Sequence, residues 1–463
     1  MRRERIRIFS GGLIAVLLVW EGIGRDSPSL FIGSRLELFV DAFLIEKMEG
    51  VTFKLHPPKP AEIVLRFDKP WEGRTSGYVT VFQDGEIFRM YYRAQRDEHA
   101  PEFTAYAESQ DGINWQKPSL GIFEFNGSRE NNIVWGGEGT HNFAPFRDNN
   151  PAVPDSERYK AVGGRPLWAF VSTDGIRWKR LRDEPLLTKG AFDSLNTIFW
   201  DSERKQYVAY IRDFKNGVRS IRRTTSVNFV DWSEPEWLDF GDTPLEHFYT
   251  NAVIPYFRAP HIYLAFPKRF FPERKVVKDW PYSGISDAVF MASRDGRYWT
   301  RMFMEAFLRP GSDPANWTER NMQIAWGILQ TSREELSIYW IEHYRHPDIR
   351  VRRGVLRLDG FVSLNAPYRG GEFVTKPLVF HGRRLIINFS TSAAGSIRVE
   401  IQDQEGRPIP GFTLADSQEI YGDSIAHVVS WRSGFDVGRF QGSPIRLRFV
   451  MKDADLYSIS FQP

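Results

Sequence analysis

The sequence predicts an all-β protein, a five-bladed β-propeller followed by a C-terminal β-sandwich. A turn motif recurs at near-regular intervals, pairs of strand-like runs precede its copies, and amphipathic helical patterns are scarce. Aromatic residues also make up 15% of the 463 residues. This excess favours sheets, because aromatic side chains pack well on a pleated surface.

The N-terminal segment has the pattern of a signal peptide. Four arginines within the first seven residues precede an apolar run over residues 11–20. That run is too short to cross a bilayer comfortably, which takes about 20 residues. We therefore expect residues 1–24 to be removed and the mature protein to be secreted or periplasmic, without stable insertion in a membrane. The alternatives are an uncleaved anchor and a wrongly assigned start codon.

The repeated turn has the pattern Ser-x-Asp-Gly-x-x-Trp. Intact copies begin at Ser109, Ser172 and Ser293, a degraded copy begins at Ser226, and Asp359-Gly360 is a candidate relic of a fifth. The Asp-equivalent positions 111, 174, 228, 295 and 359 lie 54 to 67 residues apart. Asp-Gly supplies the backbone freedom that a tight reversal needs, so the motif predicts a structural repeat and not a catalytic site.

Strand-like runs divide the chain into blades and a second domain. Residues 77–82 and 87–92 are joined by a hairpin signal, and similar pairs of runs recur in the later repeats. Such units of about 60 residues are typical of propeller blades. We expect the propeller over residues 36–367, with residues 38–45 as the strand that closes it, and the sandwich over residues 368–463.

Asparagines recur where the first strand of each blade begins. The start of this strand lies at the mouth of a propeller's central shaft, so side chains at this position converge. The alignment brings together Asn142, Asn196, Asn251 and Asn321, with Gly77 in the first blade. They are interpreted as substrate-binding residues, and the alternative is that they cap the strands.

Charged residues lie just upstream of these strands. Glycosidic cleavage needs two carboxylic groups, one that holds a proton for the leaving oxygen and one that stays ionised. We interpret Asp193, Glu246 and Glu72 as the candidate catalytic residues. The alternative is a solvated rim. The remaining candidates for substrate binding are Arg74, His141, His247, Tyr249, Glu319 and Arg320.

Composition excludes several classes of function. The net charge of +3, from 61 basic and 58 acidic residues, is too balanced for a nucleic-acid partner. The chain has no cysteine, which excludes disulfides, zinc–thiolate sites and thiol nucleophiles. No ligand spacing predicts a metal ion, and no cofactor is expected.

In layout, the predicted blades and sandwich resemble the propeller glycoside hydrolases of family 32, and the blades alone resemble those of family 43. In those families, acidic residues from the first three blades act as nucleophile or base, stabiliser and acid. The chain lacks the segments W-x-N-D-P-N-G and E-C, and Arg147-Asp148 is not followed by proline. The resemblance therefore implies only the positions of the acids, at the strand starts. The turn is also similar to the Asp-box of sialidases.

Three functions follow from these patterns. The first is a glycoside hydrolase acting on an extracytoplasmic polysaccharide or oligosaccharide. The second is a carbohydrate-binding propeller without catalysis. The third is a polysaccharide lyase, in which Tyr249 and His247 would serve as acid and base. A fold alone does not choose among them.

Overall fold

The computed structural model describes residues 29–463, and these form an all-β chain. The helices in this range are three short 3-10 turns, η1 (Asp155–Glu157), η2 (Pro314–Trp317) and η3 (Gly438–Phe440). The predicted signal peptide, residues 1–24, lies outside the described residues.

Between residues 29 and 463, no helix is long and apolar enough to cross a membrane.

Three four-stranded antiparallel sheets follow one another along the chain. In each, the strands pair in the order of the sequence, as expected for chains folded through successive hairpins. The first sheet contains β6 (Gly77–Asp84), β7 (Ile87–Ala94), β8 (Phe103–Ser109) and β9 (Ile133–Gly136). The second contains β10 (Ala144–Arg147), β11 (Tyr159–Gly163), β12 (Trp168–Ser172) and β13 (Lys179–Arg180). The third contains β14 (Thr197–Asp201), β15 (Gln206–Lys215), β16 (Val218–Ser226) and β17 (Glu236–Trp237).

The next part of the chain forms two three-stranded sheets and then a larger one. One three-stranded sheet contains β18 (His247–Thr250), β21 (Lys268–Phe271) and β22 (Ile285–Ala288). The other contains β19 (Ile254–Tyr256), β20 (Ala259–Ala265) and β23 (Met291–Ser293). The larger sheet contains β24 (Gln323–Ile324), β25 (Leu329–Gln330), β26 (Glu335–Glu342), β27 (Arg350–Arg357) and β5 (Lys59–Arg66).

The strand that completes the larger sheet differs from the one expected. β5 pairs with β27, with Leu65 opposite Val351. The run at residues 38–45 was predicted to close the propeller, and this prediction is wrong: β2 (Glu37–Leu38) pairs with β33 of the C-terminal sheet. Phe39 and Leu44 explain the difference, because both are buried in the apolar cluster of that sheet.

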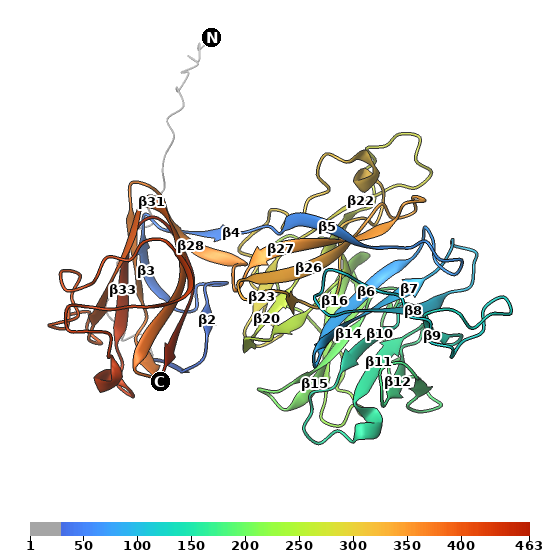
Figure 1. The fold of residues 1–463 in the computed structure, drawn as a ribbon, viewed down its shortest axis with the longest axis horizontal. Coiled ribbons are helices and arrows are strands. Elements are labelled where there is room, and N and C mark those ends of the chain that lie inside the picture. The colour runs from blue at the N-terminus through green and yellow to red at the C-terminus, as the bar shows by residue number, and fades with distance from the viewer. Residues whose placement is uncertain (1–28) are drawn as a thin grey trace, which may run out of the picture.

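The C-terminal sheet also takes strands from the start of the chain. Its path runs β3 (Ile45–Glu49), β29 (Gly371–Thr375), β33 (Arg446–Gln462), β28 (Val362–Ala366), β4 (Thr52–Leu55), with β31 (Arg384–Gln402), β32 (Asp423–Val428) and β2 attached. A parallel pair joins β1 (Leu30–Gly33) to β30 (Leu378–Phe380). Figure 1 shows β2, β3, β31 and β33 gathered at one end of the molecule, with β4, β5, β27 and β28 leading to the other sheets.

The Asp-Gly turns join neighbouring sheets. In each intact copy the Asp side chain accepts two backbone N–H groups, as Asp174 does from Ile176 and Arg177 at 2.8 Å each. A tyrosine of another sheet donates to the carbonyl of the turn glycine: Tyr91 to Gly175, Tyr210 to Gly296 and Tyr339 to Gly112. Since Tyr339 belongs to β26 and Gly112 follows β8, this contact bonds the last of these sheets to the first.

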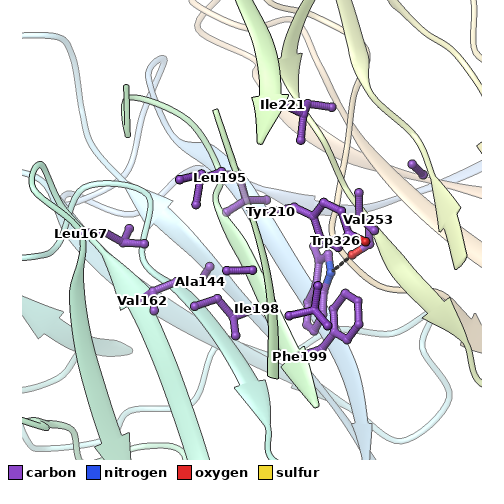
Figure 2. Packing of buried hydrophobic residues seen from close by; sticks show 14 of the residues in the cluster. Ala144, Val162, Leu167, Leu195, Ile198, Phe199, Tyr210, Ile221, Val253 and Trp326 are labelled. Carbon is purple, nitrogen blue, oxygen red and sulfur yellow. Dashed lines mark hydrogen bonds between the residues drawn. The ribbon is translucent and has the colours of Figure 1, made fainter. Parts of the chain in front are cut away.

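A central apolar cluster lies among the first strands of these sheets. Tyr78, Ala144, Ile198 and Val253 belong to it, and so does Trp326. The indole N–H of Trp326 donates to the Val253 carbonyl at 2.7 Å, and Figure 2 shows this bond beside Phe199. The backbone of Trp326 also pairs with Thr80 of β6. The space between these strands is therefore filled by side chains.

Candidate functional site

Three of the four aligned asparagines satisfy backbone groups. Asn196 donates to the carbonyls of Phe192 and Ser194, and Asn251 donates to those of Leu195 and Tyr210. Asn321 donates to the carbonyls of Ala315 and Thr318 and accepts from the Tyr344 N–H at 2.7 Å. These bonds match the alternative that the asparagines cap the strands, because buried backbone groups need partners.

Asn142 differs from the other three, because its contacts are to charged and titratable side chains. Its Oδ1 accepts from Arg93 Nη1 at 3.3 Å, and its Nδ2 lies 3.1 Å from His141 Nε2. The residue is buried, and its φ of 52° lies in the left-handed region that asparagine tolerates. Asn142 therefore connects two members of the site.

His141 lies between two carboxylates. Its Nδ1 is 2.9 Å from Glu102 Oε2, and its Nε2 is 2.8 Å from Asp193 Oδ1. Burial lowers the pKa of His141, but the bonds to Asp193 and Glu102 outweigh burial and raise the pKa above its ordinary value. The imidazole thus orients Asp193 and is itself oriented by Glu102.

Asp193 is the accessible end of this chain of bonds. Its side chain is 42% exposed, whereas that of Glu102 is 20% exposed. Burial raises the pKa of Asp193, but the hydrogen bond from His141 and the charges of His141, Arg212 and Arg165 lower it to about 2. Asp193 is therefore a carboxylate at neutral pH, held in place and open to solvent.

Tyr249, on β18, is surrounded by cations. Four cationic groups lie over its ring, at 4.4 Å from the centroid for Lys268, 5.2 Å for Arg219, 5.3 Å for Arg212 and 5.8 Å for Arg320. Such distances fall within the range of cation–π attraction. Arg212 Nη2 also lies 3.8 Å from Asp193 Oδ2, so Tyr249 and Asp193 share a neighbour.

A second tyrosine, Tyr78, has one of these cationic groups and one further arginine over its ring. Arg93 lies 4.3 Å from the centroid of Tyr78, and Lys268 lies 5.7 Å from it. Arg93 donates to the Thr75 carbonyl and to the Tyr344 hydroxyl, and its Nε is 3.7 Å from Glu102 Oε1. We call Arg93, Arg212, Arg219, Lys268 and Arg320 the cation cluster.

Glu246 lies on the other side of β18 from Tyr249. Its carboxylate is bound by Arg269 and Arg301, and Arg301 lies over the ring of Phe248. Because successive residues of a strand point to opposite faces, this places Glu246 away from Tyr249 and the cation cluster. The predicted pairing of Asp193 with Glu246 is not found among the described residues.

Glu72 is also absent from the site. It is buried, accepts from the Tyr92 hydroxyl and from Lys117 Nζ, each at 2.6 Å, and accepts from the Lys69 N–H. Tyr92 and Arg93 are neighbours on β7 and therefore face opposite ways. Glu72 lies on the face that points away from Asn142.

Glu319 is a buried carboxylate next to the cation cluster. Its Oε1 lies 2.8 Å from Arg345 Nε, and its Oε2 accepts from the Trp280 indole at 2.6 Å. Burial raises the pKa of Glu319 above its ordinary value, in spite of these partners. The next residue, Arg320, reaches the Tyr249 ring.

Two other predicted residues lie near this region. Arg74 is half-exposed and reaches Glu98, which is also bound by Arg345 and Tyr282. His247 Nδ1 accepts from the Arg219 N–H at 3.2 Å. Burial and the charge of Arg219 lower the pKa of His247.

Several members of the site were not predicted from the sequence. Glu102, Arg93, Arg212, Arg219 and Lys268 lie on or beside the later strands of each sheet, while the alignment considered only the first. The sequence does contain one shared pattern. Arg93 and Arg212 lie in the second strands of their sheets, in the segments Tyr-Tyr-Arg and Tyr-Ile-Arg.

A cavity of about 400 Å³ lies at the opposite ends of the first strands. It is largely aromatic and apolar, and its lining includes Phe82, Phe199, Trp200, Phe257 and Trp326. None of the titratable residues around His141 or Tyr249 reaches it. Within residues 29–463, no group of three or more His, Asp or Glu side chains is arranged to hold a metal ion.

No family model and no curated protein matches the sequence. Solved structures do resemble it. A chain described as a glycoside hydrolase is 12% identical, with a TM-score of 0.44, over 65% of this chain and 92% of that one. An N-acetylgalactosamine deacetylase from F. plautii is 12% identical, with a TM-score of 0.44, over 66% of this chain and 96% of that one. A fructofuranosidase from Schwanniomyces occidentalis is 10% identical, with a TM-score of 0.39, over 88% of this chain and 98% of that one. At these identities and TM-scores, the similarity assigns no activity to the chain.

Proposed function

We propose that the protein is a glycoside hydrolase that cleaves an extracytoplasmic polysaccharide or oligosaccharide, with Asp193 as a catalytic carboxylate. The observation that carries the proposal is an ionised, solvent-accessible carboxylate oriented by His141 and Glu102. In the proposed architecture, the six sheets from β5 to β27 form five blades around the central apolar cluster, with the two three-stranded sheets together making the fourth blade. The C-terminal strands form a sandwich. Asp193 then lies where the first strand of the third blade begins.

Asp193 has the properties of the group that must stay charged in glycosidic cleavage. With a pKa of about 2, it holds no proton at neutral pH. It would attack the anomeric carbon directly, or remove a proton from a water molecule that does so. In either case the bond to the leaving oxygen breaks, and that oxygen needs a proton from a second group.

Glu319 is the proposed proton donor. Its raised pKa keeps a larger share of the carboxyl protonated than an ordinary glutamate would. It precedes Arg320, and Arg320 and the Asp193 neighbour Arg212 both lie over the Tyr249 ring. Glu319 therefore replaces Glu246 as the partner of Asp193, because Glu246 is bound by two arginines on the other side of β18.

A glycan panel tests this function. The mature protein is incubated with plant, algal and bacterial glycans, and new reducing ends and released sugars are measured by chromatography. Asp193→Asn removes the charged carboxylate, and Asp183→Asn serves as a matched control because the Asp183 side chain is 96% exposed. We expect release from at least one glycan, a loss of at least about a hundredfold in Asp193→Asn, and none in the control.

Release that is unchanged in Asp193→Asn would contradict the assignment of Asp193. If none of the glycans is cleaved while one binds, the protein is a carbohydrate-binding propeller without catalysis.

A polysaccharide lyase is the second candidate function, and the surroundings of Tyr249 favour it. A lyase base removes the proton next to a uronate carboxylate, and nearby cations stabilise the charge that develops. Four cationic groups lie over the Tyr249 ring, and the lowered pKa of His247 favours the neutral imidazole that a base requires. In this case the products would be unsaturated, and Tyr249→Phe would abolish their ultraviolet absorbance.

A further inference from the structure

Three members of the cation cluster have no carboxylate partner. Within residues 29–463, no Asp or Glu oxygen lies within ion-pair distance of Arg219, Lys268 or Arg320. The neighbouring carboxylates are already engaged, since His141 bonds to both Asp193 and Glu102, and Glu319 is bound by Arg345 and Trp280. The cluster therefore carries more positive charge than its surroundings balance.

Lys268 shows this imbalance most clearly. Its residue is 0% exposed, and its Nζ has only weak polar contacts, 3.2 Å to Gln323 Oε1 and 3.4 Å to the Arg320 carbonyl. Burial and the charges of Arg320 and Arg93 lower the pKa of Lys268 well below its ordinary value. A buried amine without a counter-charge gives up its proton more readily than an ordinary lysine, and an anion beside it would favour the charged form.

Arg219 is in a similar position. Its guanidinium lies over the rings of Phe214, Tyr249 and Phe270, and its Nε is buried without an acceptor. Its Nη1 lies 3.4 Å from His247 Nδ1, a neutral acceptor. Guanidinium groups have several donors in a plane that matches the oxygens of a carboxylate or sulfate.

We propose that Arg219, Lys268 and Arg320 bind an oxyanion carried by the sugar, so that the substrate is an acidic glycan. The group is a uronate carboxylate or a sulfate ester, which share the chemistry of negatively charged oxygens. An anion at this point would supply the missing counter-charge to the cluster. The anion would lie close to Asp193, because Arg212 contacts both the Asp193 carboxylate and the Tyr249 ring that these cations surround. This inference rests on the proposed function and names its substrate class.

Calorimetric binding to Asp193→Asn tests the inference without turnover. The ligands are an oligogalacturonate, a sulfated galactosaminoglycan oligosaccharide, a neutral galacto-oligosaccharide, and inorganic sulfate and phosphate alone. Lys268→Met and Arg219→Gln are each added to Asp193→Asn. Arg297→Gln, at a 65% exposed side chain on an outer turn, is the matched control.

We expect at least one acidic oligosaccharide to bind more tightly than the neutral one. Lys268→Met and Arg219→Gln should each weaken that binding by at least about tenfold. The control Arg297→Gln should bind the oligosaccharide as tightly as Asp193→Asn alone. Lys268→Met should not lower the Tm, because methionine replaces a buried amine that lacks a counter-charge with an apolar side chain of similar length. A residue with a merely structural role would show the reverse, a lower Tm with unchanged binding.

Equal binding of acidic and neutral oligosaccharides would overturn the inference. So would binding of inorganic sulfate or phosphate as tight as that of the acidic oligosaccharide, because the oxyanion would then not belong to the sugar. Loss of binding in Lys268→Met together with a lower Tm would also count against the inference. Arg219→Gln then decides, because loss of its binding with an unchanged Tm would still support an oxyanion site. The assay needs no cleavage, so a failure of the hydrolase proposal remains distinguishable: acidic glycans would bind without being cut.

Discussion

At the scale of single residues, the surroundings of a carboxyl group decide what it can do. Asp193 and Glu319 are both acidic, yet the bonds from His141 lower the pKa of one and burial raises the pKa of the other. Hydrolysis of a glycosidic bond needs this difference, since one group must be ionised while the other donates a proton.

Glu319 should therefore set the alkaline limb of the pH–rate profile. Its raised pKa means that the protonated donor is present at low pH and is lost as the pH rises through that pKa. We expect kcat/KM to fall there, and Glu319→Gln to lower it by about 100-fold or more at all pH values. Kinetics across pH 4 to 9 on the cleaved glycan, with Glu305→Gln as an exposed control, measure both effects. Full activity of Glu319→Gln would show that another group is the acid.

How far the sequence predicts the site depends on where each residue lies. Asp193, His141 and Asn142 come from strand starts that the repeat aligns, and they do lie together. Glu246 shares the alignment but points to the other face of its strand, which the repeat period does not reveal. Lys268 was missed because a buried lysine near an apolar run has no sequence pattern of its own.

At the scale of elements, the repeated turn acts as a bond between sheets. The turn glycine at 296 has a φ of 77°, and its carbonyl accepts from the Tyr210 hydroxyl at 2.8 Å. A Cβ atom there would lie 2.5 Å from Tyr263 Cε2 and 2.6 Å from the Tyr210 hydroxyl. Both the backbone conformation and the packing therefore require glycine.

Substitutions at Gly296 and at Gly217, which lies in the hairpin between β15 and β16, separate the two requirements. Gly217 has a similar φ of 78°, but nothing lies within 4 Å of its added Cβ. Gly217→Ala should cost about 1–2 kcal/mol of unfolding free energy from the backbone alone. Gly296→Ala should cost more because of the clash, and Tyr210→Phe should cost about 1 kcal/mol for the lost hydrogen bond. Urea denaturation measures all three, and equal losses in the two glycine variants would contradict the packing argument.

The turns could be predicted because their residues are adjacent in sequence. The strand that pairs with β27 could not be predicted in the same way, because residues 38–45 and 59–66 are both strand-like. Only the long-range packing of Phe39 and Leu44 with the C-terminal sheet decides between them.

At the scale of the whole molecule, buried ion pairs join the N-terminal strands to the repeated sheets. Arg294, in the last intact turn, bonds to both Glu37 and Asp41. His261 Nε2 lies 3.3 Å from Glu37 Oε1. Burial raises the pKa of Glu37, but the His261 bond and the charges of Arg294, His261 and Arg35 lower it to about 2.

The pair at Glu37 should make stability depend on acid pH. A carboxyl group whose folded pKa is depressed contributes stability above its unfolded pKa, and this is lost as the pH falls through the folded value. We expect Glu37→Gln to cost about 3 kcal/mol of unfolding free energy at pH 6, and the difference from wild type to shrink between pH 4.5 and 2. Denaturation at several pH values, with the 74% exposed Glu49→Gln as control, tests this. A difference that is constant with pH would contradict it.

The all-β class could be predicted from composition and period, which are properties of the chain as a whole. The sequence does not predict that the N-terminal strands β2, β3 and β4 join the C-terminal sheet. Their pairing depends on long-range contacts, such as that of Leu38 with Ser458, which lies more than 400 residues further along the chain.

The most direct test of the proposed site is a crystal structure of Asp193→Asn with the acidic oligosaccharide that it binds most tightly. We expect an anomeric carbon beside residue 193 and the acidic group between Arg219, Lys268 and Arg320. A sugar seated instead in the aromatic cavity around Trp200 and Phe257, at the other ends of the first strands, would contradict it.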